Sequence, residues 1–360
     1  MRHLKELILS VLVLTGCQSL QPYAVDYLVP ADVSFPASLR TVGIVNAVQE
    51  RPSRLEGRFQ DLPDQDDNYL YRNTSYLQSS GENMASELAS ALAQENYFDE
   101  VIILDSVVII PDAARGRLSS EQVSELCAYL GVDFIISIED LQMRRQDEVA
   151  YDDYFGFYIG TTDAKIEPRV GIYYPQASER SALLIQPTDS IFWQTPGTSM
   201  SFTKRHLLSD VQMEEEASEY SSQLILDRIL PYWKTEVRYY ADGGNPLMRD
   251  AGVSVKEGDW DTAIELWKQA YEKKSLKKKT SAALNLALGY EMKDDLQEAV
   301  SWARKAKDHA YEWEKVASQD LTLSSSDCKY YTLASVYLEQ LEKRYKDVAK
   351  LKAQMAPLGY

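Results

Sequence analysis

Short apolar runs alternate with amphipathic stretches in the early part of the chain. Residues 40–48, 100–104 and 132–138 are rich in Val and Ile, which is typical of buried strands. Residues 81–96 and 119–131 place apolar side chains at helical spacing, so both are predicted helices. The order strand–helix–strand–helix–strand within about 100 residues predicts right-handed crossovers, with helices covering a sheet.

The pattern changes after residue 150. Three strand-like runs, at residues 151–159, 165–174 and 182–193, are separated by turn residues and predict an antiparallel meander. Residues 210–230 keep apolar side chains on one helical face and predict a helix. A short strand is expected at residues 235–239.

Polar segments set the expected domain limits. The sequence Gly-Gly-Asn-Pro at residues 243–246 is the clearest break, so we expect an α/β domain, a mixed sheet with helices, over residues 38–242. Residues 17–37 contain three prolines and predict a tether. Residues 50–73 are polar and predict a solvated loop, because the spacing of their aspartates does not fit a calcium-binding loop.

Residues 243–360 contain an internal repeat. Small and apolar positions recur at an offset of 36 residues, as from Ala263 to Ala299, and a third copy begins at Leu333. This pattern resembles the tetratricopeptide repeat, in which small residues let paired helices pack closely. It predicts an all-α domain of tetratricopeptide-like helical repeats that ends in a C-terminal capping helix. A generic helical bundle with coincidental alanines is the alternative.

The resemblance to tetratricopeptide repeats implies a groove lined by the first helix of each pair. Such grooves often bind extended peptides. By position, the groove residues in this sequence would be Met248, Leu284, Leu288 and Glu291. The same four residues could instead pack against the α/β domain.

The N-terminus has the order of a secretory signal. Arg2 and Lys5 precede an apolar run at residues 7–14, which is too short to cross a bilayer. Leu14-Thr15-Gly16-Cys17 then resembles the bacterial lipobox. This resemblance implies that residues 1–16 are a lipoprotein signal peptide and that Cys17 is lipidated, since only a thiol forms the required thioether. The alternative is a buried helix with an incidental cysteine.

Composition limits the possible partners. The hydrophobic content of 45%, with 24 Tyr and 6 Trp, is sufficient for packed cores. The formal net charge of −17 disfavours nucleic acid and anionic lipid, so we expect no nucleic-acid partner. Attachment to a membrane would then depend on N-terminal acyl chains. Cys127 and Cys328 lie in different segments and are expected to be unpaired thiols.

The sequence carries no recognisable catalytic or metal-binding motif. It has no nucleophile elbow, no phosphate-binding loop and no zinc-protease motif, so we expect no enzyme activity, catalytic residue, cofactor or metal. The acidic run at residues 214–216 lies early in a predicted helix, where negative charge is favourable. The sequence has one basic cluster, made of Lys273, Lys274 and residues 277–279. We expect it to be a solvated turn between repeats; the alternative is that it binds phospholipid head groups or cell-wall polymer. The aromatic-rich run at residues 151–158 could leave an exposed patch.

The α/β part also resembles a known class of lipoproteins. Phe98-Asp99-Glu100-Val101 and Leu130-Gly131-Val132-Asp133, each leading into a strand, occur in an order similar to the α/β domain of curli-export lipoproteins and of lipoprotein activators of penicillin-binding proteins. This likeness covers residues 38–240. The whole arrangement resembles a family of Bacteroidota lipoproteins with tetratricopeptide repeats, and that resemblance implies no activity.

These patterns lead to a functional hypothesis. We expect a lipid-anchored, non-enzymatic adaptor or scaffold that binds other proteins of the bacterial cell envelope. The alternative is a regulator or subunit of an envelope assembly machine, such as a cell-wall synthase activator or an export-pore component. Gln18 is not the aspartate that typically retains such lipoproteins at the inner membrane, and residues 17–22 lack the early acidic run associated with surface export in Bacteroidota. The resemblance to these lipoproteins then implies the periplasmic face of the outer membrane. An enzyme acting on envelope polymer would need convergent carboxylates near residues 150–200.

Overall fold

The computed structural model describes residues 20–49, 58–63, 69–110, 117–175, 182–272, 275–316 and 329–356. The chain forms two compact units. The described residues up to Pro30 and those of Tyr232–Lys352 form one, which we call the helical unit. Ala31–Pro231 and the described residues from Ala353 form the other, which we call the sheet unit. A mixed sheet with helices is thus followed by a helical region, although the units do not divide at the expected position between residues 242 and 243.

Three parallel strands form the centre of the sheet unit. Strand β2 (Thr41–Asn46) lies between β5 (Glu100–Leu104) and β6 (Phe134–Asp152) and pairs in parallel with both. Helices α1 (Glu82–Glu95) and α2 (Ser120–Leu130) connect these strands. The strands and helices predicted in this region are present, although two further strands stand between β2 and α1 and β6 continues to Asp152.

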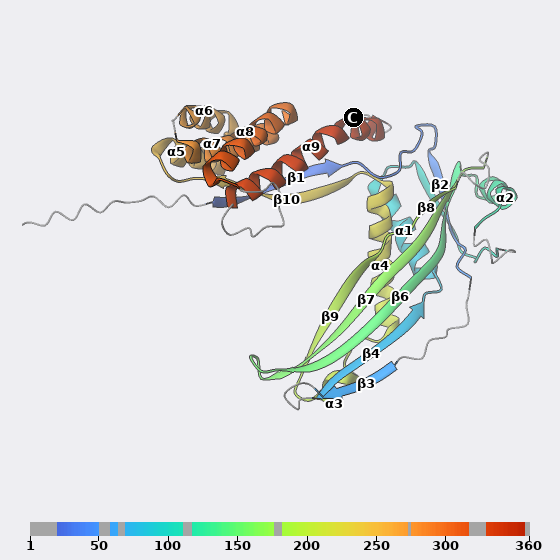
Figure 1. The fold of residues 1–360 in the computed structure, drawn as a ribbon. Helices are drawn as coiled ribbons and strands as arrows, with labels where there is room; N and C mark the ends of the chain where they lie inside the picture. The colour runs from blue at the N-terminus through green and yellow to red at the C-terminus, as the bar shows by residue number, and fades with distance from the viewer. Residues whose placement is uncertain are drawn as a thin grey trace, which may run out of the picture. The chain divides into compact units, whose positions relative to one another are not determined.

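Long antiparallel strands extend this sheet. Strand β6 pairs with β7 (Phe157–Tyr173), and β7 pairs with β8 (Leu183–Ile185) and β9 (Asp189–Gly197). On its other side β6 pairs with β4 (Tyr69–Gln78), which pairs with β3 (Arg58–Pro63). Figure 1 shows β6 and β7 running side by side along the sheet unit.

Two predictions in this region are wrong. Residues 50–73 were expected to be a loop, but they include β3 and the first half of β4, which were missed because their sequence lacks the regular alternation of apolar and polar residues by which a strand is recognised. Residues 151–159 were expected to be one strand, but a turn at residues 153–156 joins β6 to β7. Gly156 in this turn has a φ of 73°, a left-handed conformation that glycine adopts without a Cβ clash.

The core of the sheet unit lies between the sheet and two helices. Helix α4 (Asp210–Ile229) packs beside α1, and the hydroxyl of Ser222 donates to the carbonyl of Met84 over 3.2 Å. The short α3 (Met200–Arg205) precedes α4. Fully buried apolar side chains from the strands and helices fill this core: Val42, Ile44, Met84, Leu88, Leu92, Phe134, Ile136, Ile138, Met213, Ala217 and Ile225.

Helix α2 covers a second, smaller apolar cluster. Its Val123 and Cys127 pack with Val45 and Ile135. Cys127 is a buried free thiol, and burial raises its pKa to about 11, so it stays protonated and unreactive at neutral pH. Cys328 lies outside the described residues.

Asp133, which lies between α2 and β6, is hydrogen-bonded to the start of β2. The Asp133 carboxylate accepts from the backbone N–H groups of Arg40 and Thr41 at 2.7 and 2.9 Å. These two donors, foremost Thr41, hold the pKa of Asp133 below its usual value. Asp133 therefore aligns the start of β2 with β6, which explains why an aspartate stands directly before the strand.

The helical unit contains five helices within its described residues. They are α5 (Pro246–Glu257), α6 (Trp260–Tyr271), α7 (Leu276–Met292), α8 (Leu296–Glu314) and α9 (Lys329–Met355), which belongs to this unit up to Lys352. The small residues of the predicted repeat are buried where these helices meet, including Ala263, Ala299, Ala303 and Ala306. No helix in the described part of the chain has the length and apolar composition needed to cross a membrane.

A two-stranded antiparallel ribbon completes the helical unit. Strand β1 (Leu20–Val29) pairs with β10 (Tyr232–Ala241) along its whole length. The ribbon lies against the helices (Figure 1). Residues 17–37 were predicted to be a tether, but Leu20–Val29 of this segment form strand β1. The sequence did not reveal this strand, because its partner β10 lies far along the chain.

Candidate functional site

The four residues expected to line an open groove are buried. Met248 on α5 and Leu288 on α7 pack with Val25 and Tyr240 of the ribbon. Leu284 points to a different cluster, which it shares with α8 and α9. Glu291 is also buried, in a network with the ribbon and α9. The prediction of an open peptide groove at these positions is wrong. The ribbon of the same chain covers Met248 and Leu288 and contacts Glu291, and helices α8 and α9 cover Leu284.

An asparagine holds the ribbon on α7. The Asn285 side-chain amide donates to the carbonyl of Ala241 over 2.7 Å and accepts from its N–H over 2.8 Å. Asn285 is fully buried, so the two bonds satisfy its polar groups as well as those of the strand. A side-chain amide that bonds both backbone groups of one residue fixes the position of β10 along α7.

A buried ion network holds the middle of the ribbon. The Arg238 guanidinium of β10 donates twice to the Glu291 carboxylate, over 3.0 and 3.1 Å. Glu291 also accepts from the Tyr337 hydroxyl over 2.6 Å and from Arg344 over 3.1 Å. A buried charge pair of this kind is stable only when hydrogen bonds satisfy its remaining atoms, which this network provides.

The network shifts the pKa values of its members. Burial by itself would lower the pKa of Arg238, but the hydrogen bonds and charge of Glu291 outweigh it and raise that pKa. Burial, together with the Glu291 carboxylate, raises the pKa of the Tyr337 hydroxyl well above its usual value. The guanidinium is therefore charged and the phenol neutral at any physiological pH.

The sequence contained one signal for the polar contacts that hold the ribbon. Asn285 is the polar residue inside the run Ala-Ala-Leu-Asn-Leu-Ala-Leu at residues 282–288, and a buried amide needs partners. Arg238 and Tyr337 gave no comparable signal, because each lies in a segment with ordinary exposed polar neighbours.

A groove remains open at the end of the ribbon, between the ribbon and α9. We call it the ribbon groove; its volume is about 560 Å³. Apolar side chains and charges of both signs line it: Asp26, Tyr27, Leu28, Val29, Tyr232, Trp233, Lys234, Leu296, Glu339, Lys343, Arg344, Asp347, Val348 and Leu351. The guanidinium of Arg344 lies 4.8 Å from the centre of the Tyr27 ring, so a cation–π contact joins the two walls.

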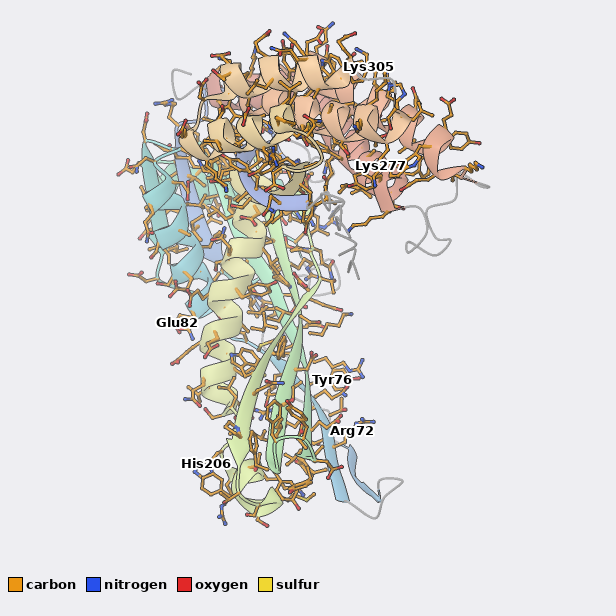
Figure 2. All side chains as sticks on the ribbon, turned by 90° about the vertical axis from the view of Figure 1, so that its left-hand side faces the viewer. Arg72, Tyr76, Glu82, His206, Lys277 and Lys305 are labelled. Carbon is orange, nitrogen blue, oxygen red and sulfur yellow. The ribbon has the colours of Figure 1, made fainter. Side chains whose placement is uncertain are left out.

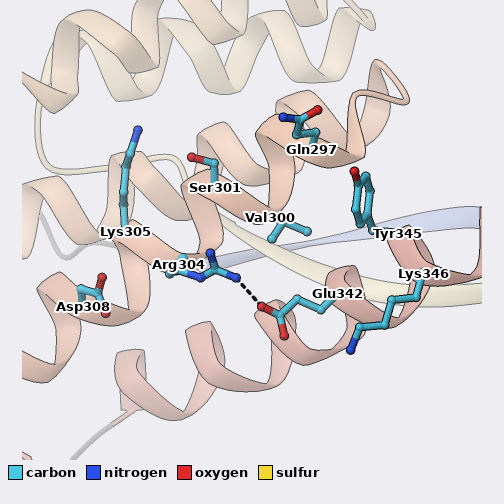
Figure 3. Close-up of a pocket in the computed structure, with 9 residues that line it drawn as sticks. All are labelled: Gln297, Val300, Ser301, Arg304, Lys305, Asp308, Glu342, Tyr345 and Lys346. Carbon is cyan, nitrogen blue, oxygen red and sulfur yellow. Dashed lines mark hydrogen bonds and ion pairs between the residues drawn. The ribbon is translucent and has the colours of Figure 1, made fainter.

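A second hollow of about 630 Å³ lies between α8 and α9. Figure 3 shows Arg304 and Glu342 pointing toward one another across it, and they form an ion pair of 2.6 Å. Both side chains are solvent-accessible, so this pair contributes little to stability. Compared with the ribbon groove, this hollow has fewer apolar side chains, with Val300 and Tyr345 on its walls.

The turn between β6 and β7 presents exposed aromatic side chains. Tyr154 is 90% exposed and Phe155 is 59% exposed. The Asp152 carboxylate accepts from the N–H groups of both residues at 3.0 Å, which fixes the turn. We call these residues the aromatic tip. The predicted exposed patch in this run is confirmed for Tyr154 and Phe155.

The acidic run at residues 214–216 has structural contacts. Glu214 accepts from the Ser79 hydroxyl over 2.7 Å and from the Ser80 N–H over 3.3 Å, just before α1. Glu216 accepts from the indole N–H of Trp193. These two glutamates thereby connect α4 to α1 and β9.

A carboxyl group is buried in the sheet unit. Glu139 accepts from the Tyr173 hydroxyl and lies 3.3 Å from the guanidinium of Arg169. Burial raises the pKa of Glu139 despite these partners. The group lies at the register shift of β6, next to Ile138, and is enclosed by the protein.

The remaining predicted residues are distributed widely. Lys277, at the start of α7 (Figure 2), lies 5.5 Å from the ring centre of Trp313, and Lys279 lies 5.1 Å from that of Tyr271. Lys273, Lys274 and Cys17, the residue predicted to be lipidated, lie outside the described residues. The ring of His309 bonds the Tyr271 hydroxyl over 2.8 Å, and burial lowers its pKa. In the part of the chain that the structure describes, no three His, Cys, Asp or Glu side chains cluster as metal ligands would.

The fold defines a protein of two units, a mixed α/β unit and a helical unit closed by a ribbon. The chain belongs to the family described as a domain of unknown function, DUF8603, whose model matches residues 39–240, more than half of the sequence. A second model, described as a domain of unknown function, DUF6340, matches residues 249–343. No curated protein and no solved structure matches the chain.

Proposed function

We propose that this protein is a lipid-anchored, non-enzymatic adaptor of the bacterial cell envelope. Acyl chains on Cys17 hold it at a membrane, at the periplasmic face of the outer membrane. Its helices α5 to α8 form tetratricopeptide-like pairs, and α9 caps them. The lipobox-like order Leu-Thr-Gly-Cys at residues 14–17 supports the anchor.

The ribbon groove is the observation that carries the adaptor role. Apolar side chains such as Tyr27, Val348 and Leu351 provide the contact area that a partner would bury. Acidic and basic side chains alternate around them, including Glu339, Lys343 and Asp347. Charges of both signs beside apolar area suit a protein segment better than a polyanion, which needs one sign. The proposed occupant is an apolar segment of another envelope protein flanked by charged residues.

Site-specific crosslinking in cells tests this role. A photo-crosslinking amino acid at Lys343, on the rim of the groove, is expected to capture one envelope protein, and the same amino acid at Tyr129, an exposed position on α2, is not. The captured protein, once purified, should bind the wild-type chain and lose about tenfold in affinity for Val348→Glu, a change of roughly 1.4 kcal/mol. Equal capture at both positions, or equal affinity for the variant, would overturn the groove assignment.

The lipid anchor is tested separately. Labelled palmitate should enter the wild-type protein and be absent from Cys17→Ser. Incorporation into both, or into neither, would show that the anchor is not at this thiol.

The aromatic tip favours a second candidate, a subunit of an envelope assembly machine. Two large exposed aromatic side chains, Tyr154 and Phe155, held by Asp152 at the end of a long hairpin, are suited to burial against another subunit. Size measurement of the detergent-solubilised native complex should then show an assembly that Tyr154→Ser/Phe155→Ser dissociates. A wild-type protein of monomeric size would exclude this candidate.

A further inference from the structure

The ribbon has two different faces. One face carries Val25 and Tyr240, which are buried against the helices. On the other face, directly paired residues of the two strands put mostly uncharged side chains side by side: Pro22 with Tyr239, Ala24 with Val237, Asp26 with Thr235, and Leu28 with Trp233. We call this the outer ribbon face. Asp26, Leu28 and Trp233 also line the ribbon groove, so the face and the groove adjoin at that end of the ribbon.

Large apolar side chains on the outer ribbon face are open to solvent. Trp233 is 72% exposed, Val237 is 52% exposed and Tyr239 is 41% exposed. Pro22 and Ala24 opposite them are exposed as well. Exposure of a contiguous apolar surface to water is unfavourable. An exposed apolar patch of this kind therefore indicates a surface that is covered by a partner or a membrane in the working protein.

The charge of this face limits what can cover it. Asp26 is its charged residue, and the carboxylate accepts from the Thr235 hydroxyl over 2.6 Å. The face thus offers no array of cations to an anionic ligand. Trp and Tyr are the side chains that settle at the boundary between lipid head groups and acyl chains, because each has an apolar ring and one polar group.

The position of the face in the sequence indicates the occupant. Leu20, the first residue of β1, follows Cys17 by three residues. Three residues of chain span at most about 10 Å. An acyl chain on Cys17 would therefore hold the start of the ribbon within about 10 Å of the bilayer surface.

We propose that the outer ribbon face lies on the bilayer that holds the lipid anchor, with Trp233 and Tyr239 at the head-group boundary. This inference rests on the proposed lipidation of Cys17. The acyl chains supply the attachment, and the face fixes which side of the helical unit meets the membrane. The surface it fits is that of a zwitterionic phospholipid bilayer, since a chain of net charge −17 is repelled by anionic lipid.

Quenching of tryptophan fluorescence by brominated lipid tests the contact. The lipidated full chain is reconstituted on phosphatidylcholine vesicles whose acyl chains carry bromine near the head group. The wild-type protein should lose part of its emission, and Trp233→Phe should remove most of that quenchable part. Trp313→Phe, on α8, is the matched control and should leave the quenchable part unchanged.

A charge introduced on the outer ribbon face provides a second test. Val237→Asp, at an exposed position, is expected to fold normally by circular dichroism and to lower the quenching of Trp233. Tyr129→Asp adds the same charge on α2, in the sheet unit, and should leave quenching unchanged.

The outcomes separate the inference from the proposed anchor. A wild-type chain that fails to float with the vesicles overturns the lipid anchor and this inference together. A chain that floats while its Trp233 is not quenched overturns the inference and leaves the anchor in place. A dimer in solution that Trp233→Phe dissociates would also overturn it, because a second copy would then cover the face.

Discussion

The contacts that stabilise the inside of the sheet unit differ from those that position the ribbon inside the helical unit. In the sheet unit a continuous apolar core joins the sheet to α1 and α4, and side chains such as Leu88 and Phe134 are fully buried in it. In the helical unit the ribbon is positioned by buried polar groups, the amide of Asn285 and the Arg238–Glu291 pair. Apolar contacts supply burial without direction, whereas hydrogen bonds specify one position of a strand. The ribbon therefore has a defined register on the helices, at the cost of burying charge.

The largest expected effect comes from breaking the buried pair. Glu291→Leu leaves Arg238 buried without its main carboxylate partner, and we expect the helical unit to lose about 3–5 kcal/mol. Hydrogen exchange measured by mass spectrometry should show lower protection in β10 and unchanged protection in β6.

The double variant sharpens that test. Arg238→Leu/Glu291→Leu removes both charges, and it should recover much of the stability that the single variant loses. Arg304→Leu breaks the exposed pair with Glu342 and is the matched control, with an expected loss of about 0–1 kcal/mol. A single variant no worse than Arg304→Leu would show that the network does not hold the ribbon.

In the sheet unit, the corresponding change is the truncation of a core side chain. Leu88→Ala on α1 removes buried methyl groups and leaves a cavity, so the expected loss is about 2–5 kcal/mol. The same exchange measurement should now show the loss in β6 and not in β10. Equal losses in both strands would mean that the two units unfold as one.

A smaller effect is expected where two helices of the helical unit approach closely. A Cβ added at Gly289 of α7 would lie 2.6 Å from Cγ1 of Ile264 on α6. Gly289→Ala gains helix propensity but forces the helices apart, and overpacking of this kind costs about 1–3 kcal/mol. Urea unfolding followed by circular dichroism should show a net loss, in contrast to a neutral or stabilising Ser301→Ala on α8. A stabilised Gly289→Ala would show that this contact is loose.

The smallest effect concerns acid sensitivity in the sheet unit. The backbone donors of Thr41 and Arg40 lower the folded-state pKa of Asp133, so its contribution is fully present above the unfolded pKa of about 3.9. That contribution is lost as the pH falls through the lower folded-state pKa. The difference in stability between wild type and Asp133→Asn should thus be constant near neutral pH and shrink below about pH 4. Asp153→Asn, in the exposed turn, controls for the loss of one negative charge.

Local signals predicted much of the sheet unit. Helix α2 was predicted over residues 119–131, and the structure has Ser119 as its N-cap and Gly131 as its C-cap. The strand Glu100–Leu104 was predicted with its observed bounds. The turn of the long hairpin was missed, because Tyr151 and Tyr158 are strong strand formers that hid the short Asp-Asp-Tyr-Phe-Gly stretch between them.

The ribbon and the candidate site depend on contacts that no local pattern reveals. Pairing of Val29 with Tyr232 brings together residues separated by the whole sheet unit. Without that pairing, β1 looked like a tether, and Met248 and Leu288 looked like the wall of an open groove. The exposure of a helical face depends on what packs on it, and here the covering segment comes from the other end of the α/β region.

The separation of β1 from β10 along the chain has a consequence for biosynthesis. During synthesis β1 emerges ahead of the entire sheet unit, and its partner follows only after Pro231. Until then the nascent protein carries a strand whose N–H and C=O groups have no β10 to bond, and an unpaired strand edge can pair with another chain. A fragment that ends at Pro231 would contain β1 without β10, and we expect it to aggregate more readily than the full chain.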